Sequence, residues 1–176
     1  MISKAELLGV FEAHANNIHL VRTLQVIARA TDLHLALRSV IEMLNKNPVG
    51  LQKPLQLLAD RPKLLHSVDQ LHLTIVRTVI TEVFELTKDY CYTTGQIKAL
   101  NEQPWFDVLR MCRNTFNHNF QFKFNKKDQK MLPIEWSGIQ IDATLEGKQI
   151  SLSIFSLAAA MEWLEELEVF VSTKLQ

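Results

Sequence analysis

Apolar side chains recur at helical spacing over most of the chain, and this periodicity constrains the fold more than any other feature. Within residues 3–30 they lie three, four or seven positions apart, at Leu7, Phe11, Ile18, Val21, Leu24 and Ala28. Within residues 64–90 a similar stripe passes through Leu64, Val68, Leu71, Ile75, Val79, Val83 and Leu86. Both runs are much longer than ordinary strands. They predict a mainly α fold, with helices packed in a bundle.

The same pattern predicts further helices over residues 104–119 and 155–174, and residues 31–44 form either a second helix or a kinked continuation of the first. Asn16 and Asn17 are a possible break in the first helix, and residues 45–54 form a loop because they hold two prolines and a glycine. Pro104 suits a first helical turn, where its missing N–H costs nothing. The last helix is apolar on one side through Leu157, Met161, Leu164 and Leu167.

The region from about 133 to 152 departs from the helical pattern. It contains short alternating segments separated by turn residues, and Glu146-Gly147-Lys148 is the expected tight turn. The prediction is therefore a small β-hairpin inserted before the C-terminal helix. Because the chain has 176 residues, we expect a single domain spanning residues 1–176.

Charge and cysteine content exclude several classes of protein. Nineteen Lys and Arg balance nineteen Asp and Glu, whereas a protein that coats nucleic acid is usually basic. The N-terminus carries Glu6 and Glu12 among apolar residues, which indicates an amphipathic helix and not a signal peptide. Cys91 and Cys112 form neither a disulfide framework nor a zinc motif. We expect a cytoplasmic protein with two buried free thiols, no cofactor, no metal and no membrane association.

The helix predicted at 104–119 has two contrasting faces. At about 100° per residue, its apolar face holds Trp105, Val108, Leu109, Cys112 and Phe116. The opposite arc is polar and holds Arg110, Arg113, Asn114, Asn117 and His118. Phe106 and Met111 border this arc, and a purely solvated face would have little use for them. The arc is expected to face solvent or a partner.

These polar residue types suit phosphodiester chemistry on RNA. His exchanges its proton near neutral pH, Arg binds phosphate through a planar fork, and Asn can orient a neighbour. RNA supplies its own nucleophile, the 2′-OH, so cleavage needs a base, an acid and charge stabilisation but no metal. The alternative is a solvated helix end, where the helix dipole favours a cation.

The sequence Arg113-Asn114-x-x-x-His118 resembles the signature of the HEPN superfamily. In that signature an arginine is followed by a polar residue, often Asn, three further residues and a histidine. The family places it near the end of a late helix in an all-α bundle. The resemblance covers this motif and the general layout, and the β-hairpin departs from the minimal family bundle.

The resemblance implies a metal-independent endoribonuclease that acts as a homodimer, with the motifs of two chains in one cleft. His118 would then be the acid and base, Arg113 the phosphate and transition-state clamp, and Asn114 the orienting residue. Many such proteins are toxins or defence effectors, so an antitoxin protein is a further expected partner. Other members have lost activity, and the alternative is a non-catalytic HEPN-like dimerisation or interaction module.

A basic segment follows the motif and suggests where RNA would bind. Phe120, Phe122 and Phe124 interleave lysines, and aromatic rings among cations suit single-stranded RNA. The candidate RNA-binding residues are Arg110, Asn117, Lys123, Lys126 and Lys127. The alternative is an edge strand with its phenylalanines inward and its lysines outward.

Overall fold

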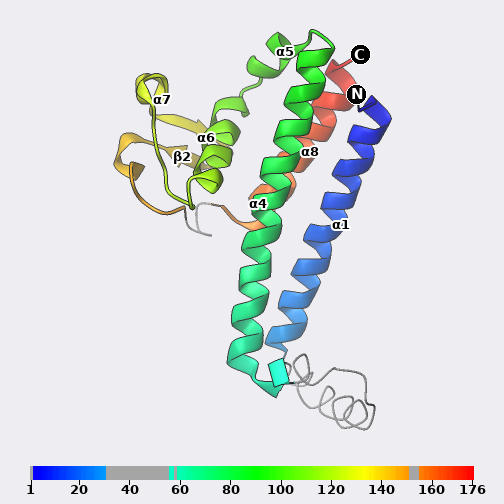
Figure 1. The fold of residues 1–176 in the computed structure, drawn as a ribbon, viewed down its shortest axis with the longest axis vertical. Coiled ribbons are helices and arrows are strands. Elements are labelled where there is room, and N and C mark those ends of the chain that lie inside the picture. Colours follow the sequence, from blue (N-terminus) through cyan, green and yellow to red (C-terminus); the bar gives the residue numbers. More distant parts are fainter. Residues whose placement is uncertain (1, 31–55, 58, 151–154) are drawn as a thin grey trace. The chain divides into compact units, whose positions relative to one another are not determined.

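The computed structural model describes residues 2–30, 56–57, 59–150 and 155–176 (Figure 1). It confirms a mainly α fold with a small antiparallel hairpin before the C-terminal helix. The described elements are α1 (Lys4–Arg29), α4 (Arg61–Thr93), α5 (Ile97–Asn101), α6 (Phe106–Asn117), α7 (Lys126–Met131), β1 (Ile134–Trp136), β2 (Ile139–Ile141), a 3-10 turn η1 (Ala143–Leu145) and α8 (Leu157–Lys174). The helix expected at 31–44 and the loop expected at 45–54 both lie outside the described residues.

The chain divides into two compact units: Met1–Asn16 with Val76–Gln176, and Asn17–Ile75. Helices α1 and α4 contribute to both units. Asn16 and Asn17 do not break α1, which is continuous, and both side chains are exposed. Pro104 precedes α6, which begins at Phe106.

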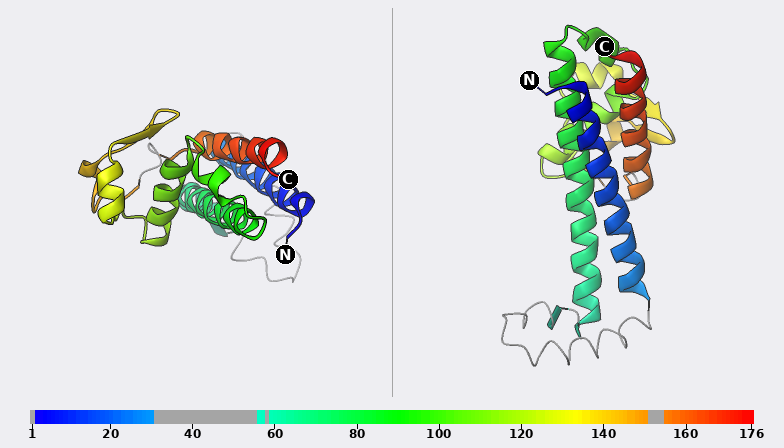
Figure 2. Two further views of the ribbon diagram at one scale, coloured as in Figure 1. Left: turned by 90° about the horizontal axis from the view of Figure 1, so that it is seen from above. Right: turned by 90° about the vertical axis from the view of Figure 1, so that its right-hand side faces the viewer.

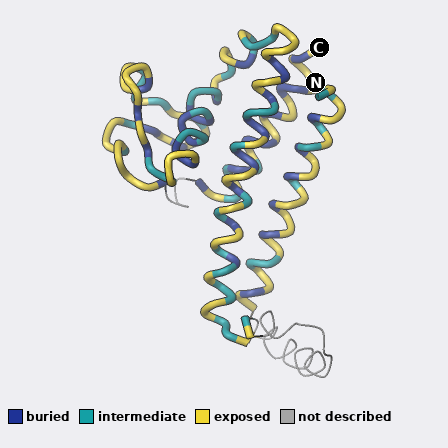
Figure 3. Tube along the Cα trace, viewed as in Figure 1, coloured by how far each residue is buried: buried dark blue, intermediate teal, exposed yellow. Residues whose placement is uncertain are grey.

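Aromatic side chains dominate the core of the first unit. Phe116 of α6 contacts Phe155 edge-on at 5.5 Å, and Phe155 contacts Trp163 of α8 at 4.5 Å. Trp163 stacks on Trp136 of β1 at 5.4 Å. Each such pair contributes about 1 kcal/mol beyond the area it buries. This row of rings joins the end of α6 to α8 and the hairpin, and the buried stretches of these elements are visible in Figure 3.

Both chain ends are fixed to this first unit, where they lie close together (Figure 2). The Lys4 ammonium donates to the Leu175 carbonyl at 2.6 Å, and the Tyr90 hydroxyl donates to the Gln176 carbonyl at 2.6 Å. α1, α4 and α8 are therefore held together at the end where the chain begins and finishes.

The second unit pairs the later part of α1 with the first part of α4. Gln25 Nε2 lies 2.8 Å from His72 Nδ1, and Arg29 forms an ion pair with Asp69 at 3.1 Å. Burial lowers the pKa of His72. The predicted stripe on α4 is partly wrong, because Leu71 is 39% exposed and His72 takes the buried position. Leu71 and His72, three and four residues after Val68, both lie on its side of the helix, and the structure buries the second of them.

The hairpin lies where it was expected, but it turns elsewhere. Ile134 pairs with Ile141 and Trp136 with Ile139, so the turn is Ser137-Gly138. Both residues have positive φ, 47° and 76°, as a type I′ turn requires. The Glu146-Gly147-Lys148 turn instead follows η1. Strand β2 ends before Asp142 because its side chain accepts a hydrogen bond from the Thr144 N–H at 2.8 Å.

The segment after α6 pairs with residues 147–150. The Phe122 N–H donates to the Lys148 carbonyl at 3.0 Å, and the Ile150 N–H donates to the Phe120 carbonyl at 2.7 Å. Phe122 and Phe124 are buried while Lys123 is exposed. The expectation that the phenylalanines of this segment point inward is therefore confirmed for Phe122 and Phe124.

Candidate functional site

Helix α6 buries the face that the sequence predicted. Trp105, the residue before the helix, and Val108, Leu109, Cys112 and Phe116 within it are each at most 1% exposed, which confirms the apolar face.

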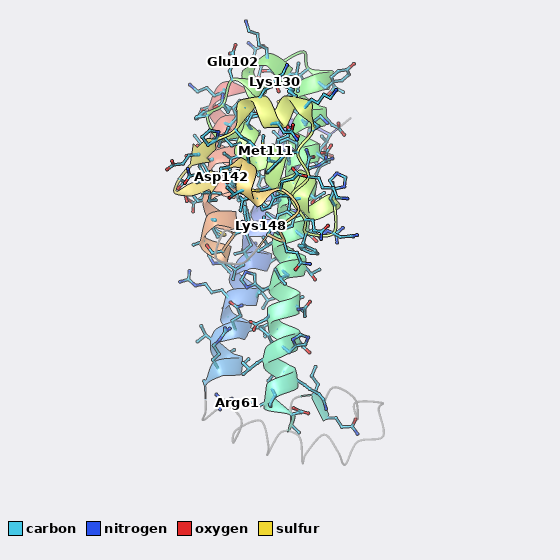
Figure 4. All side chains as sticks on the ribbon, turned by 90° about the vertical axis from the view of Figure 1, so that its left-hand side faces the viewer. Arg61, Glu102, Met111, Lys130, Asp142 and Lys148 are labelled. Carbon is cyan, nitrogen blue, oxygen red and sulfur yellow. The ribbon has the colours of Figure 1, made fainter. Side chains whose placement is uncertain are left out.

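Met111, expected at the rim of the polar arc, is only 2% exposed. The expectation failed because α6 also contacts β1, so a second layer covers a side that the helix alone would leave open (Figure 4). Phe106 is half-buried and packs on Phe84 of α4 at 5.8 Å.

Arg113 and Asn114 are fixed to each other and to α4. The Arg113 guanidinium forms an ion pair with Glu85, and its Nη1 donates to Asn114 Oδ1 at 2.9 Å. The Lys88 ammonium lies 3.6 Å from the other oxygen of Glu85. The side chain of Arg113 keeps 26% of its surface exposed. It therefore lies against α4 and does not project fully into solvent as the helical arc suggested.

His118 lies at the exposed end of the same helix. It is the C-cap of α6, and its backbone N–H donates to the carbonyls of Asn114 and Thr115 at 3.0 and 3.1 Å. Its side chain and that of Asn117 are exposed. The last turns of α6 thus carry an arginine paired with Glu85, an amide that accepts a hydrogen bond from this arginine, and an exposed histidine.

The turn that follows His118 is strained and rigidly held. Asn119 and Phe120 have positive φ, 55° and 63°, and the Gln121 N–H donates to the His118 carbonyl at 3.1 Å. Positive φ suits Asn but is rare for a bulky residue such as Phe. The Phe120 ring contacts Phe116 edge-on at 5.8 Å, and the Arg77 guanidinium lies 5.6 Å from its centroid. Such strain persists only where the surroundings enforce it, and it is concentrated at functional sites.

Arg110, three residues before Arg113, has different partners. It forms ion pairs with Asp107 at 3.2 Å and with Asp128 at 2.7 Å. Asp128 is 1% exposed and also closes the capping box of α7 with Asn125. Arg110 therefore joins α7 to α6. This residue was expected to bind RNA, but its charge is already paired within the chain.

The other candidate RNA-binding residues are open to solvent. Asn117, Lys123, Lys126 and Lys127 are all exposed, the last two in the first turn of α7. Lys130 near the end of α7 is exposed as well (Figure 4).

Sequence reasoning missed Glu85 and Arg77, both on α4. Neither carries a local signal, because each acquires its partner only when α4 packs against a later segment of the chain: Arg113 for Glu85 and Phe120 for Arg77. Four-residue spacing places Arg77, Thr81 and Glu85 near one face of α4, and that spacing becomes informative only once the partners are known.

The two thiols are free and buried, as predicted. Burial raises the pKa of Cys91 to about 11 and raises the pKa of Cys112 as well. Among the described residues, no three His, Cys, Asp or Glu side chains are grouped so that they could hold a metal ion. Within the same part of the chain, no helix is both long enough and apolar enough to cross a membrane.

Comparison of the chain with known proteins finds no similar protein. The chain matches no protein-family model, and neither curated proteins nor solved structures give a significant match.

Proposed function

We propose that this chain is a HEPN-like endoribonuclease that cleaves RNA without a metal ion, at a site formed by two copies of the chain. One observation carries the proposal. The end of α6 fixes Arg113 and Asn114 while leaving His118 exposed on the same helix. A charge clamp with an accessible proton carrier next to it is the minimum that this reaction needs.

The proposed reaction uses the 2′-OH of RNA as its nucleophile. A base takes the 2′-OH proton as the O2′–P bond forms, and an acid gives a proton to O5′ as the P–O5′ bond breaks. The products are a 2′,3′-cyclic phosphate and a 5′-OH. His118 is the proton-transfer group, and Arg113 stabilises the charge on the phosphorane. Asn114 accepts a hydrogen bond from Arg113, so its role here is to orient the guanidinium.

Proton counting favours a homodimer. The reaction needs one group that takes a proton and one that gives it, yet each chain contributes a single histidine to the motif. A two-fold axis would supply two copies of His118 and of Arg113, and isologous interfaces are the commonest kind. Sedimentation at micromolar concentration tests this step. A monomer that still cuts RNA would rule out the shared site.

The exposed residues beside the motif are the proposed RNA contacts. Asn117, Lys123, Lys126 and Lys127 can reach phosphates without breaking an internal ion pair. Arg110 would have to leave Asp107 and Asp128 to do so. We therefore assign the RNA-binding role to the exposed residues and a structural role to Arg110.

One observation favours the rival, a non-catalytic HEPN-like interaction module. The Arg113 charge is already matched by Glu85, as expected of an arginine that stabilises the fold. A toxin or defence RNase should poison its host on expression unless an antitoxin is supplied, whereas an interaction module should be harmless.

The direct test is cleavage of labelled single-stranded RNA by the purified chain in excess EDTA. His118→Ala should abolish the cutting, and His19→Ala is the matched control because His19 is also an exposed histidine on a helix. Equal cutting by wild type and His118→Ala would refute the proposed role of the motif.

A further inference from the structure

Arg77 is the arginine near the end of α6 whose charge no described carboxylate balances. The first unit contains three arginines. Arg110 is paired with Asp107 and Asp128, and Arg113 with Glu85. Arg77 is exposed and forms no ion pair with the described residues. Its guanidinium lies over the ring of Phe120.

The contact with Phe120 orients this cation beside the motif. The guanidinium carbon of Arg77 lies 5.6 Å from the ring centroid, within cation–π range. Phe120 follows His118 by two residues and is held at a φ of 63°. Its backbone carbonyl also accepts the Ile150 N–H at 2.7 Å. The strained turn therefore fixes the platform on which Arg77 rests.

Helix α4 spaces Arg77 and the Glu85–Arg113 pair along the site. Glu85 contacts Arg113, and Arg77 contacts Phe120. Their separation along α4 is two turns, roughly 12 Å at 1.5 Å per residue. The segment from Arg113 to Phe120, which includes His118, runs between these two contacts. An RNA strand lying on this segment with its scissile phosphate at Arg113 would extend toward Arg77.

We propose that Arg77 binds a backbone phosphate of single-stranded RNA that flanks the scissile phosphate. This inference rests on the proposed function, because it takes the motif as the cleavage site. A guanidinium stacked on a ring keeps its N–H edge free to donate two parallel hydrogen bonds to phosphate oxygens. Arg77 thereby selects substrates that are longer than a single phosphodiester linkage.

The test measures binding and cleavage separately. In the His118→Ala background, fluorescence anisotropy with a labelled RNA of roughly ten nucleotides gives the affinity over a range of salt concentrations. Arg77→Gln should weaken binding about tenfold and lower the slope of log Kd against log salt by about 0.7, the value of one phosphate contact on a single strand. Arg77→Lys should retain most of the slope, and Arg22→Gln, an exposed arginine of α1, should change neither quantity.

Substrate length gives a second readout that a purely structural role would not alter. On the long RNA, Arg77→Gln should raise KM with little change in kcat, whereas on a dinucleoside monophosphate kcat/KM should equal that of wild type. An unchanged salt slope, an equal loss in Arg77→Lys, or no RNA binding by the His118→Ala chain would each overturn the inference. If cleavage depends on His118 but not on Arg77, only this inference fails. If Arg77 governs binding but nothing is cut, the proposed function fails instead.

Discussion

Arg110 and Arg113 lie almost one turn apart on α6, yet their surroundings differ in kind. Arg110 is bound by two carboxylates, and the side chain of one of them, Asp128, is only 2% exposed. Arg113 is bound by a single carboxylate from α4 and by the amide of its own neighbour. The Arg110 cluster is closed by α7, while the Arg113 cluster is open at His118.

In the proposed function, this difference assigns a structural role to Arg110 and a chemical role to Arg113. For Arg110 to bind a ligand through its paired N–H groups, it would have to leave Asp128 as an unpaired buried charge, which is costly. We propose that Arg113, whose side chain is 26% exposed, exchanges its carboxylate for a phosphate. We expect variants in the Arg110 cluster to change stability and variants in the Arg113 cluster to change cleavage or RNA affinity. Four experiments test the two clusters and the apolar face beneath them.

The largest effect on cleavage is expected at His118, beside the Arg113 cluster. His118→Ala should abolish detectable RNA cleavage, because a positioned acid or base contributes about a thousandfold. Its free energy of unfolding should stay within about 1 kcal/mol of wild type, because an exposed side chain contributes little packing. Single-turnover cleavage and urea unfolding measure the two quantities. A large loss of stability without a loss of cleavage would mean that His118 supports the fold and not the chemistry.

The next largest effect, on stability, is expected in the Arg110 cluster. Asp128→Asn leaves the Arg110 guanidinium without its buried partner and should lower the free energy of unfolding by about 3 kcal/mol. Cleavage per folded molecule should be retained. Asp107→Asn is the control, because its partly exposed pair should contribute under about 1 kcal/mol. Equal shifts in urea unfolding for the two variants would show that burial of Asp128 is not what fixes α7.

A smaller effect separates the enzyme from the interaction module. Glu85→Gln keeps an acceptor for Arg113 but removes the negative charge, so affinity for single-stranded RNA should rise by about threefold. Anisotropy titration of the variant at fixed salt measures this change. The interaction module predicts unchanged RNA affinity and only a small loss of stability.

The smallest effect concerns the apolar face beneath the motif. Cys112 has no exposed surface, and burial raises the pKa of its thiol, so alkylation at pH 8 should be slow until urea unfolds the chain. A raised thiol pKa adds stability that is complete below the unfolded-state value near 9.0 and is lost as pH rises beyond it. Rapid labelling of Cys112 in the native protein would mean that α6 is rotated from the orientation described.

Much of the fold follows from periodicity in the sequence. The buried face of α6 was predictable because five apolar side chains repeat at helical spacing before and within it. The place of the hairpin was predictable from the alternation near residue 139. Its turn was missed because Ser137 provides no strong signal for positive φ, whereas Glu146-Gly147-Lys148 does resemble a turn.

The candidate site was predictable in composition but not in its contacts. The motif names Arg113, Asn114 and His118, yet nothing near them in sequence points to Glu85 or Arg77. Long-range charge pairs depend on how helices pack, which a single sequence does not specify. The burial of Met111 was missed for the same reason, since a lone helix does not reveal that α6 also packs against β1.

End-group analysis of RNA cut in excess EDTA tests the central claim most directly. The account predicts that the wild-type chain cuts single-stranded RNA, that the products carry a 2′,3′-cyclic phosphate and a 5′-OH, and that His118→Ala yields none. Cleavage that stops in EDTA and returns with magnesium, or products that end in a 5′-phosphate, would contradict it.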